Sequence, residues 1–415
     1  MGLFKKKKDV QELELSEKHV GLRFALVIIL LGIGLACIAF FLFSLLSEED
    51  GWQSIDIEDK SFMSEGEIVL NYELGKGELS ATKEKRAIQG VYGEALKKAY
   101  KLFDSYREYE GIANISYLNK HPNEETAVDP ELYEAFELMA EFEDRSIYLA
   151  PMQAEYRNVF MCTDDVNAAM GDPYFNEEQR EYVKKLMTFI SDENAVRVEL
   201  LGDNKIKLCV SEDYSAFATE NGIENFLDMA WLTNAFVVDS VADALVARGY
   251  TRGYINSYDG YTRYLDAANN RYAINLHNKN GNTVYPAAVA ECGNISALVQ
   301  LRNYPINKSN ARDFYAYSNG SFASRYVDVN DGYYKSSQSE LLSYSSTESC
   351  AQIALTLREI FIADSFDENK IMQAKEKGIY SIWFADHVVY YNNSKLEIKD
   401  MYNYEGITYA KKCVE

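Results

Sequence analysis

Two carboxylates frame the stretch of this sequence whose residue types are best placed for chemistry. Asp228 begins an apolar segment, 228–247, that has the composition of a buried helix closed by Gly249, and Asp239 lies within it. A carboxylate at such a position can contact a ligand or a cation in a cleft. It can equally cap the helix and stabilise its dipole, and the sequence leaves both interpretations open.

The other residues that commonly catalyse reactions or bind metals are scattered. The four histidines are far apart, so a multi-histidine metal site is not predicted. Five cysteines lie beyond residue 50 without a C-x-x-C pair, which argues against a disulfide framework and a zinc knuckle. The sequence also lacks a nucleophile elbow, a P-loop, a G-x-G-x-x-G motif and a metalloprotease motif.

A charge-free apolar run from Phe24 to Leu46 divides the chain. It would form about 34 Å of helix, enough to cross the hydrocarbon core of a membrane. Basic residues precede it and the acidic triplet 48–50 follows, so the positive-inside rule predicts a cytoplasmic N-terminus. We therefore expect four parts: a cytoplasmic tail at 1–23, a single-pass helix in the cell membrane at 24–46, a juxtamembrane linker at 47–60 and an extracytoplasmic domain at 61–415.

The exported part is strongly acidic. Residues 1–47 hold six of the 42 basic and four of the 64 acidic residues, so the remainder carries 36 basic and 60 acidic residues, a net charge near −24. Such a surface repels nucleic acid and anionic lipid headgroups. We therefore predict no nucleic-acid partner, and contact with the membrane through the single helix.

The pattern of elements in the exported part predicts an α+β fold. Helical spacing covers 87–109, 131–142, 177–190 and 347–362. Two half-buried strands at 195–200 and 205–210 flank a Gly-Asp-Asn turn and predict a hairpin. Short strands at 67–72 and from residue 253 onward complete a mixed order, which argues against a doubly wound parallel sheet.

The order of these elements, and several motifs on them, resembles the ApbE family, the FAD:protein FMN transferases. The segment L-D-M-A-W-L-T-N-A-F-V-V-D at 227–239 is similar to the family pattern L-D-L-G-G-I-A-K-G-Y-A-V-D. I-S-Y-L-N at 115–119 resembles an S-x-x-N loop, and I-N-S-Y-D-G at 255–260 resembles V-N-A-G-G-D. R-Y-V-D-V-N-D-G at 325–332 resembles H-I-I-D-P-x-T-G, and A-Q-I-A-L-T at 351–356 resembles A-D-A-L-A-T.

The resemblance implies an ApbE-like fold and an extracytoplasmic enzyme. With FAD and Mg²⁺ it would attach FMN to a threonine of an exported acceptor protein, such as a flavoprotein of a redox complex. It implies catalytic roles for Asp328 and Arg325, and nucleotide contacts from Asn119, Asp228, Asn234, Asp239, Asn256 and Asp259. It implies metal ligands at Gln352 and Thr356, with Glu348 one helical turn earlier. The turn near Asn234 and the helix around Thr356 are expected to converge on a nucleotide-sized cleft.

Several matched positions depart from the family pattern in ways that weaken this chemistry. K-G becomes N-A at 234–235 and G-G becomes Y-D at 258–259, which adds side chains near the dinucleotide and removes a positive charge. Gln352 replaces an aspartate and offers magnesium only a neutral oxygen. Arg325 replaces a histidine and cannot act as a neutral base. We therefore expect a degenerate relative of the transferases.

Two further interpretations remain open. The exported domain can be a non-catalytic scaffold that binds flavin or docks a protein at the membrane surface. Alternatively, the 32 tyrosines of the chain belong to an exported adhesion or sensor domain unrelated to the family. The arrangement around residues 228–239 distinguishes these alternatives.

Overall fold

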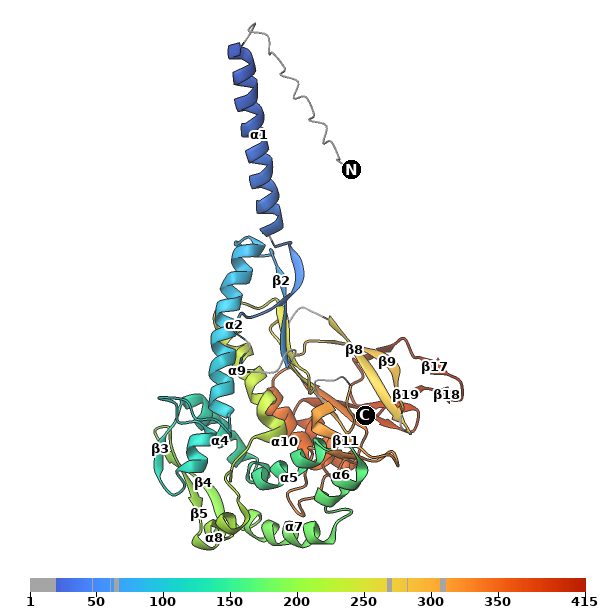
Figure 1. Ribbon diagram of the computed structural model, residues 1–415. Helices are drawn as coiled ribbons and strands as arrows, with labels where there is room; N and C mark the ends of the chain where they lie inside the picture. The colour runs from blue at the N-terminus through green and yellow to red at the C-terminus, as the bar shows by residue number, and fades with distance from the viewer. Residues whose placement is uncertain are drawn as a thin grey trace, which may run out of the picture. The chain divides into compact units, whose positions relative to one another are not determined.

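The computed structural model describes residues 20–46, 48–59, 61–62, 67–266, 271–281, 283–306 and 311–415 (Figure 1). The chain divides into two compact units, Met1–Glu49 and Asp50–Glu415. Most of the tail predicted at 1–23 lies outside the described residues, which begin at Val20.

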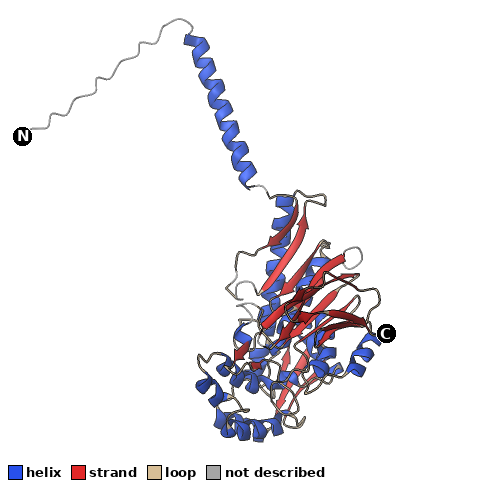
Figure 2. Cartoon of the chain, turned by 90° about the vertical axis from the view of Figure 1, so that its right-hand side faces the viewer, coloured by secondary structure: helices blue, strands red, loops and turns tan. Residues whose placement is uncertain are grey.

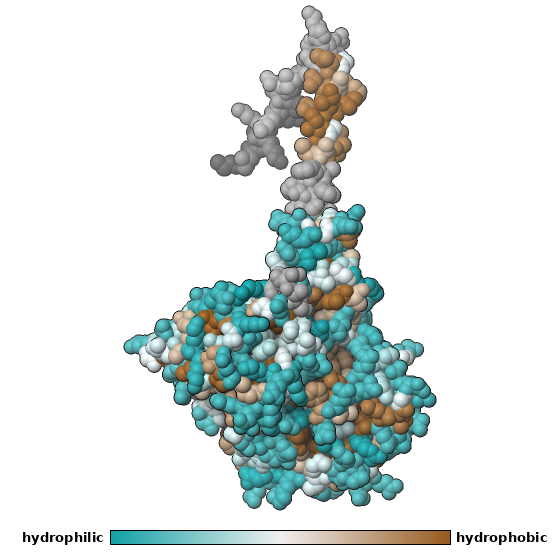
Figure 3. All heavy atoms as spheres, turned by 180° about the vertical axis from the view of Figure 1, so that it is seen from behind, coloured by the Kyte–Doolittle hydropathy of each residue, from teal (hydrophilic) through white to brown (hydrophobic). Residues whose placement is uncertain are grey.

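The first unit contains the helix α1 (Val20–Leu46), whose 27 residues correspond to about 40 Å. Its described large apolar side chains, from Leu22 to Ile38, are 50–68% exposed. On the face shown in Figure 3, the described residues of α1 are mainly hydrophobic, whereas most of the surface of the second unit is hydrophilic. The segment Ala230–Ala247 also has the length and composition of a membrane span, but 61% of it is buried inside the second unit, which makes it a core helix.

A nine-stranded sheet forms the frame of the second unit. Its order is β1-β2-β6-β7-β10-β13-β14-β15-β19, and neighbours are antiparallel except β15 and β19, which are parallel. The strands are β1 (Gly51–Ile55), β2 (Ile68–Leu74), β6 (Gly253–Ser257), β7 (Tyr261–Tyr264), β10 (Ala297–Arg302), β13 (Glu340–Ser345), β14 (Ile379–Ala385), β15 (Val388–Tyr391) and β19 (Ala410–Cys413). The pairing of β2 with β6 brings Glu67 beside Tyr258, whose N–H donates to the Glu67 carbonyl at 2.9 Å.

Alternation along the strands gives the sheet two apolar faces. In β10, Val299 and Leu301 belong to the main core, whereas Leu298 belongs to a second core on the opposite face. Four helices cover the main-core face (Figure 2): α2 (Ala81–Phe103), α9 (Thr233–Ala247), α10 (Cys350–Phe361) and α11 (Glu368–Glu376). The second core is closed by a three-stranded sheet of β8 (Arg271–Asn280), β9 (Thr283–Gly293) and β16 (Glu397–Lys399).

The chain between α2 and α9 forms a mainly helical part with a small sheet of order β3-β5-β4. Its elements are α3 (Ile115–Lys120), β3 (Glu125–Ala127), α4 (Pro130–Glu141), η1 (Ser146–Leu149), α5 (Ala150–Phe160), α6 (Asp165–Gly171), α7 (Glu177–Ile190), β4 (Val196–Gly202), β5 (Lys205–Val210), α8 (Glu212–Asn221) and η2 (Ala230–Leu232). Later short elements are η3 (Ala311–Asp313), β11 (Phe314–Ala316), β12 (Phe322–Ser324), β17 (Asn403–Tyr404) and β18 (Ile407–Thr408). This arrangement confirms the predicted α+β class.

The start of the second unit differs from the sequence prediction. Residues 51–55, predicted as part of the linker 47–60, form β1, which pairs with β2 so that Ile55 lies opposite Leu70. Ile55 is the one fully buried residue of this edge strand. A strand with a single buried side chain produces almost no apolar alternation, which explains why the pattern did not reveal it.

Candidate functional site

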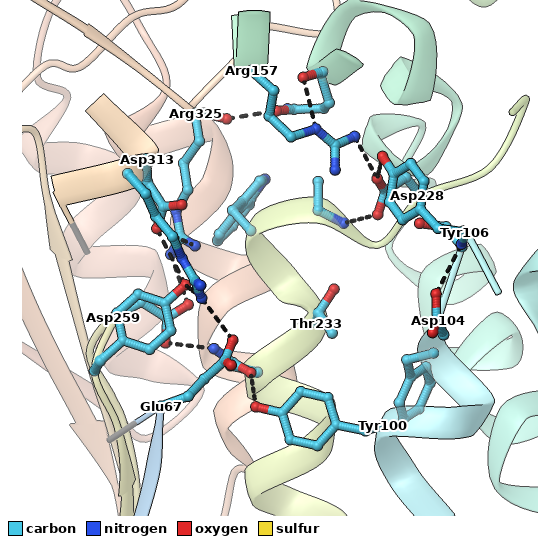
Figure 4. Close-up of a pocket in the computed structure, with 18 of the residues that line it drawn as sticks. Glu67, Tyr100, Asp104, Tyr106, Arg157, Asp228, Thr233, Asp259, Asp313 and Arg325 are labelled. Carbon is cyan, nitrogen blue, oxygen red and sulfur yellow. Dashed lines mark hydrogen bonds and ion pairs between the residues drawn. The ribbon is translucent and has the colours of Figure 1, made fainter. Parts of the chain in front are cut away.

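A cavity of about 490 Å³ lies at the start of α9 (Figure 4). Its lining comes from the segment before β2, the end of α2, α5, the turn before α9 and the start of α9, the loop after β6, η3 and the residue that follows β12. The volume is in the range of binding sites for small organic ligands. The side chains that face it are a mixture of aromatic and charged groups, so hydrogen bonding and electrostatics decide what it can hold.

The turn before α9 positions the floor of the cavity. Asn119 holds this turn: its Oδ1 accepts from the backbone N–H groups of residues 226–227, and its Nδ2 donates to the carbonyl of residue 227. Asp228 Oδ1 then accepts from the Ala230 N–H at 2.8 Å. Ala230 has a φ of +49°, a conformation that favours glycine, and glycine stands here in the family pattern. The turn leads into Thr233, the first residue of α9, which lies between the two walls of the cavity in Figure 4.

One wall carries a network of ion pairs and hydrogen bonds centred on Arg325. Its Nη2 lies 2.9 Å from Asp259 Oδ2, and its Nη1 lies 3.3 Å from Asp313 Oδ2. Asp259 Oδ1 accepts from Asn234 Nδ2 at 3.1 Å, and Asn234 Oδ1 accepts from the Tyr100 hydroxyl at 3.2 Å. Burial by itself lowers the pKa of Arg325, but the two carboxylates outweigh burial and raise that pKa well above its usual value. Arg325 is therefore a permanent cation held by two anions.

The network continues to the edge of the cavity through Tyr258. Its hydroxyl donates to Asp313 Oδ2 at 3.3 Å and accepts from Arg312 Nη2 at 3.1 Å. Arg312 also pairs with Glu67 at 3.0 Å, and its guanidinium lies 5.1 Å from the centroid of the Tyr258 ring. Burial raises the pKa of Asp313, and the charge of Arg325 opposes that rise.

The opposite wall holds Asp228 and Arg157 (Figure 4). Arg157 Nη2 lies 3.2 Å from Asp228 Oδ2, which also accepts from the Tyr106 hydroxyl at 2.9 Å. The Arg157 guanidinium lies 4.6 Å from the centroid of the Tyr106 ring. Burial raises the pKa of Asp228, and the charge of Arg157 counteracts part of that shift. Asp104, next to this group, accepts from the Tyr109 hydroxyl at 2.8 Å.

The charges that line the cavity are paired with one another. Of the residues described in the structure, five carboxylates and three guanidinium groups line the cavity: Glu67, Asp104, Asp228, Asp259 and Asp313 against Arg157, Arg312 and Arg325. Every one of these guanidinium groups lies within 3.3 Å of at least one of these carboxylates. Five negative and three positive groups leave a formal excess of two negative charges.

Four of the residues predicted from the family pattern line this cavity: Asp228, Asn234, Asp259 and Arg325. They come from three motifs that are separate in the sequence, and the fold brings them to one cavity. Their partners, however, are mainly each other and neighbouring side chains. Arg157, Arg312 and Asp313 were not identified from the sequence, because none of the three falls within a motif of the pattern.

Asn119 and Asp239, predicted as nucleotide contacts, stabilise the fold through hydrogen bonds to the backbone. Asn119 fixes the turn before α9, as described above. Asp239 accepts from the backbone N–H groups of Cys350 and Ala351, both at 2.9 Å, and pairs with Arg263 at 2.8 Å. Its carboxylate therefore stabilises the N-terminal end of α10. Neither residue is part of the cavity lining.

Asp328 and Asn256 also lie outside the cavity lining. Asp328 is buried, pairs with Lys335 at 2.9 Å and accepts from both the backbone and the side chain of Asn330. Asn256 lies in β6, between β2 and β7. The residues predicted as catalytic are thus separated, because Arg325 lines the cavity whereas Asp328 stabilises the turn that follows it.

The residues predicted as metal ligands are engaged locally. Gln352 Oε1 accepts from the Ser349 N–H at 2.8 Å and completes a capping box with the Ser349 hydroxyl. The Thr356 hydroxyl donates to the Gln352 carbonyl at 2.9 Å, and Glu348 accepts from the Thr347 hydroxyl at 3.1 Å. Within the part of the chain that the structure describes, no group of three or more His, Cys, Asp or Glu side chains is placed to hold a metal ion. This donor set does not fit Mg²⁺, which needs several oxygen ligands directed at one point.

The expected convergence of the Asn234 turn and the Thr356 helix on one cleft is not found. Asn234 lines the cavity, but Glu348, Gln352 and Thr356 do not. The start of α10 is anchored on Asp239, five residues after Asn234, which corresponds to about 7.5 Å along α9. The metal-helix motif is therefore displaced along α9 from the cavity.

The second unit is an α+β domain with a cavity at the N-terminal end of its apolar central helix, and small-molecule sites commonly occupy cavities of this kind. No protein-family profile and no curated protein matches the sequence. Among the solved structures that resemble it in fold are two ApbE proteins. The ApbE protein from Thermotoga maritima is 12% identical, with a TM-score of 0.53 over 80% of this chain and 93% of that chain. The flavin transferase ApbE from Vibrio cholerae is 14% identical, with a TM-score of 0.53 over 85% of this chain and 97% of that chain. The second unit therefore has the ApbE-like fold that its motifs predicted.

Proposed function

We propose that residues 50–415 bind a flavin in the cavity at the start of α9 and do not transfer FMN with magnesium. One observation carries the proposal. Residues from three separate motifs of the flavin-transferase pattern meet in a cavity of about 490 Å³, whereas Gln352 and Thr356 lie outside it and are engaged within α10. The ligand site has been kept, and the metal site has not.

The lining of the cavity suits a planar heterocycle. Partly exposed aromatic side chains border it, among them Phe62, Tyr106, Phe160 and Tyr258. Aromatic faces of this kind stack on flat ring systems. Hydrogen-bonding groups such as the Thr233 hydroxyl and the Gln153 amide oxygen lie among the aromatic and charged side chains and can orient a bound ligand.

The same lining argues against transfer. Moving FMN from FAD requires that the charge on the pyrophosphate be neutralised as its bond breaks, normally by a metal ion and free cations. The α10 oxygens are engaged, and the three cavity arginines already bind carboxylates. Arg325, at the position of the family's histidine, is held as a cation and cannot accept a proton.

The proposal is tested with the full chain in detergent micelles. Flavin fluorescence is followed as the protein is added to riboflavin, FMN or FAD, and we expect saturable binding of at least one of them. The protein is also incubated with FAD, Mg²⁺ and an exported flavoprotein acceptor, and covalent flavin is read by in-gel fluorescence. We expect no adduct, whereas the Vibrio cholerae flavin transferase, as a positive control, should label its acceptor. Failure of all three flavins to bind, or a magnesium-dependent adduct, would contradict the proposal.

We also propose that α1 anchors this domain in the cell membrane with residues 1–23 in the cytoplasm. The exposed apolar surface of α1 and the basic residues before it support this orientation. Protease added to intact spheroplasts should digest the 50–415 unit and spare a tag fused to the N-terminus. Digestion of the tag with protection of the unit would reverse the orientation, and recovery of the whole chain in the soluble fraction would remove the anchor.

A further inference from the structure

We infer that the cavity at the start of α9 selects an uncharged flavin, of the riboflavin type, over flavins that carry phosphate. This inference rests on the proposed function and specifies its ligand. It is carried by the arrangement of charges in the cavity rather than by the fold, because the fold alone does not distinguish a neutral flavin from a flavin nucleotide.

The first step is the net charge of the side chains that line the cavity. Among the residues that the structure describes, the lining holds five carboxylates and three guanidinium groups and no lysine. The position that is lysine in the family pattern is Asn234, whose amide is already bonded to Asp259 and Tyr100. A phosphate group would therefore add negative charge to a partly enclosed space that already has a formal excess of two negative charges.

The second step is the availability of the arginines. Arg325 uses Nη2 to hold Asp259, which is 6% exposed, and Nη1 to hold Asp313. To bind a phosphate through both nitrogens, it would have to release these carboxylates. Arg157 holds the buried Asp228 through Nη2, so a phosphate contact that used both of its Nη groups would compete with that carboxylate. Leaving a buried carboxylate without its cation is strongly unfavourable, and this cost opposes the binding of a phosphate to Arg325 or Arg157.

The third step concerns the helix dipole, which has the opposite effect. The N-terminal end of α9 reaches the cavity at Thr233 and contributes about half of a positive elementary charge. That contribution is smaller than the excess of two carboxylates, so the field in the cavity stays negative. The preceding 3₁₀ turn also satisfies the Thr233 N–H, which donates to the Ala230 carbonyl.

The fourth step is the kind of ligand that an acidic and aromatic cavity binds best. The ribityl chain of riboflavin carries several hydroxyl groups, and each can donate a hydrogen bond to a carboxylate without adding charge. Asp104, Asp259 and Asp313 supply acceptor oxygens around the cavity. A polyhydroxylated, uncharged chain attached to a flat ring therefore matches both the aromatic and the acidic parts of the lining.

Riboflavin and FMN form the decisive pair, because they differ only by the phosphate. With the full chain in detergent at low ionic strength, we expect riboflavin to bind at least about tenfold more tightly than FMN. Added salt should narrow this difference, because it screens the repulsion. FAD is expected to bind more weakly than riboflavin as well.

A variant tests the cause of the preference. Asp313→Asn removes one negative charge and retains a hydrogen-bond acceptor for Arg325, so the ratio of the FMN affinity to the riboflavin affinity should rise about fivefold. Glu181→Gln, on the exposed surface of α7, makes the same change in net charge away from the cavity and should alter neither affinity. FMN binding as tight as riboflavin in the unmodified chain would overturn this inference and leave flavin binding intact. Absence of binding by every flavin would overturn the proposed function and this inference with it.

Discussion

Replacing Arg325 with alanine should lower the free energy of unfolding of the second unit by about 3–5 kcal/mol. The guanidinium is 9% exposed and holds Asp259 and Asp313, so its removal leaves two carboxylates without their cation in a poorly hydrated wall. All three tryptophans lie in this unit, and Trp231 and Trp383 are buried. Tryptophan fluorescence of the full chain in detergent during urea unfolding therefore measures the effect.

Arg271→Ala is the matched control for this prediction. Arg271 also pairs with two carboxylates, Glu291 and Glu397, but its side chain is 53% exposed. Exposed ion pairs contribute about 0–1 kcal/mol, so this variant should unfold almost like the unmodified protein. Equal losses in the two variants would show that the Arg325 network is not a buried, mutually dependent set of charges.

The Arg325→Ala defect should depend on pH in a defined direction. Burial already raises the pKa of Asp313, and the Arg325 charge opposes that rise, so loss of Arg325 raises the pKa further. Between the unfolded pKa of about 4 and this raised value, the folded state binds more protons than the unfolded state, and stability falls as pH rises. The defect should therefore be smaller at pH 5 than at pH 8, and the reverse order would contradict the assignment.

Local signals predicted much of the fold. The helices predicted at 131–142 and 177–190 are α4 and α7, and the side chains of Asp129 and Asn176 cap their first turns. The hairpin of β4 and β5 forms with Asp203 and Asn204 in left-handed conformations at the turn. Such features depend on neighbours in sequence, and for that reason the sequence reveals them.

Element boundaries were less accurate where the local signal was weak. The helix predicted at 87–109 is α2, which begins at Ala81 and ends at Phe103. Its first turn is mostly polar, and after Phe103 the chain turns so that Asp104 can accept the backbone N–H groups of residues 106 and 107. Apolar periodicity detects neither boundary. The extra residues at the start of α2 are mostly polar, and the residues after Phe103 include tyrosines that continue the apolar pattern.

The site was predicted only in part, for a different reason. Family motifs pointed to Asp228, Asn234, Asp259 and Arg325, which share one cavity. A motif does not show which partner a side chain finds, however. Gln352 looked like a weakened metal ligand, whereas its oxygen completes the cap of α10. Such pairings depend on tertiary geometry that residue identity alone does not determine.

Thr233→Trp tests most directly whether the cavity is the flavin site. Thr233 stands at the first position of α9 between the two walls, is half-buried, and belongs to neither charged network. An indole there would fill the space that a flavin ring needs, so riboflavin affinity should fall about a hundredfold or more. Thr219→Trp, at an exposed position of α8, is the control and should bind riboflavin normally. Both variants should show the unfolding midpoint of the unmodified chain to within a few degrees.

The measurement is a riboflavin titration of the three full-length proteins in detergent, followed by quenching of flavin fluorescence. Saturable binding to the unmodified chain and to Thr219→Trp, with binding to Thr233→Trp reduced about a hundredfold, is the result that the cavity geometry predicts. A folded Thr233→Trp protein that binds riboflavin as tightly as the unmodified chain would place the flavin elsewhere and contradict the account.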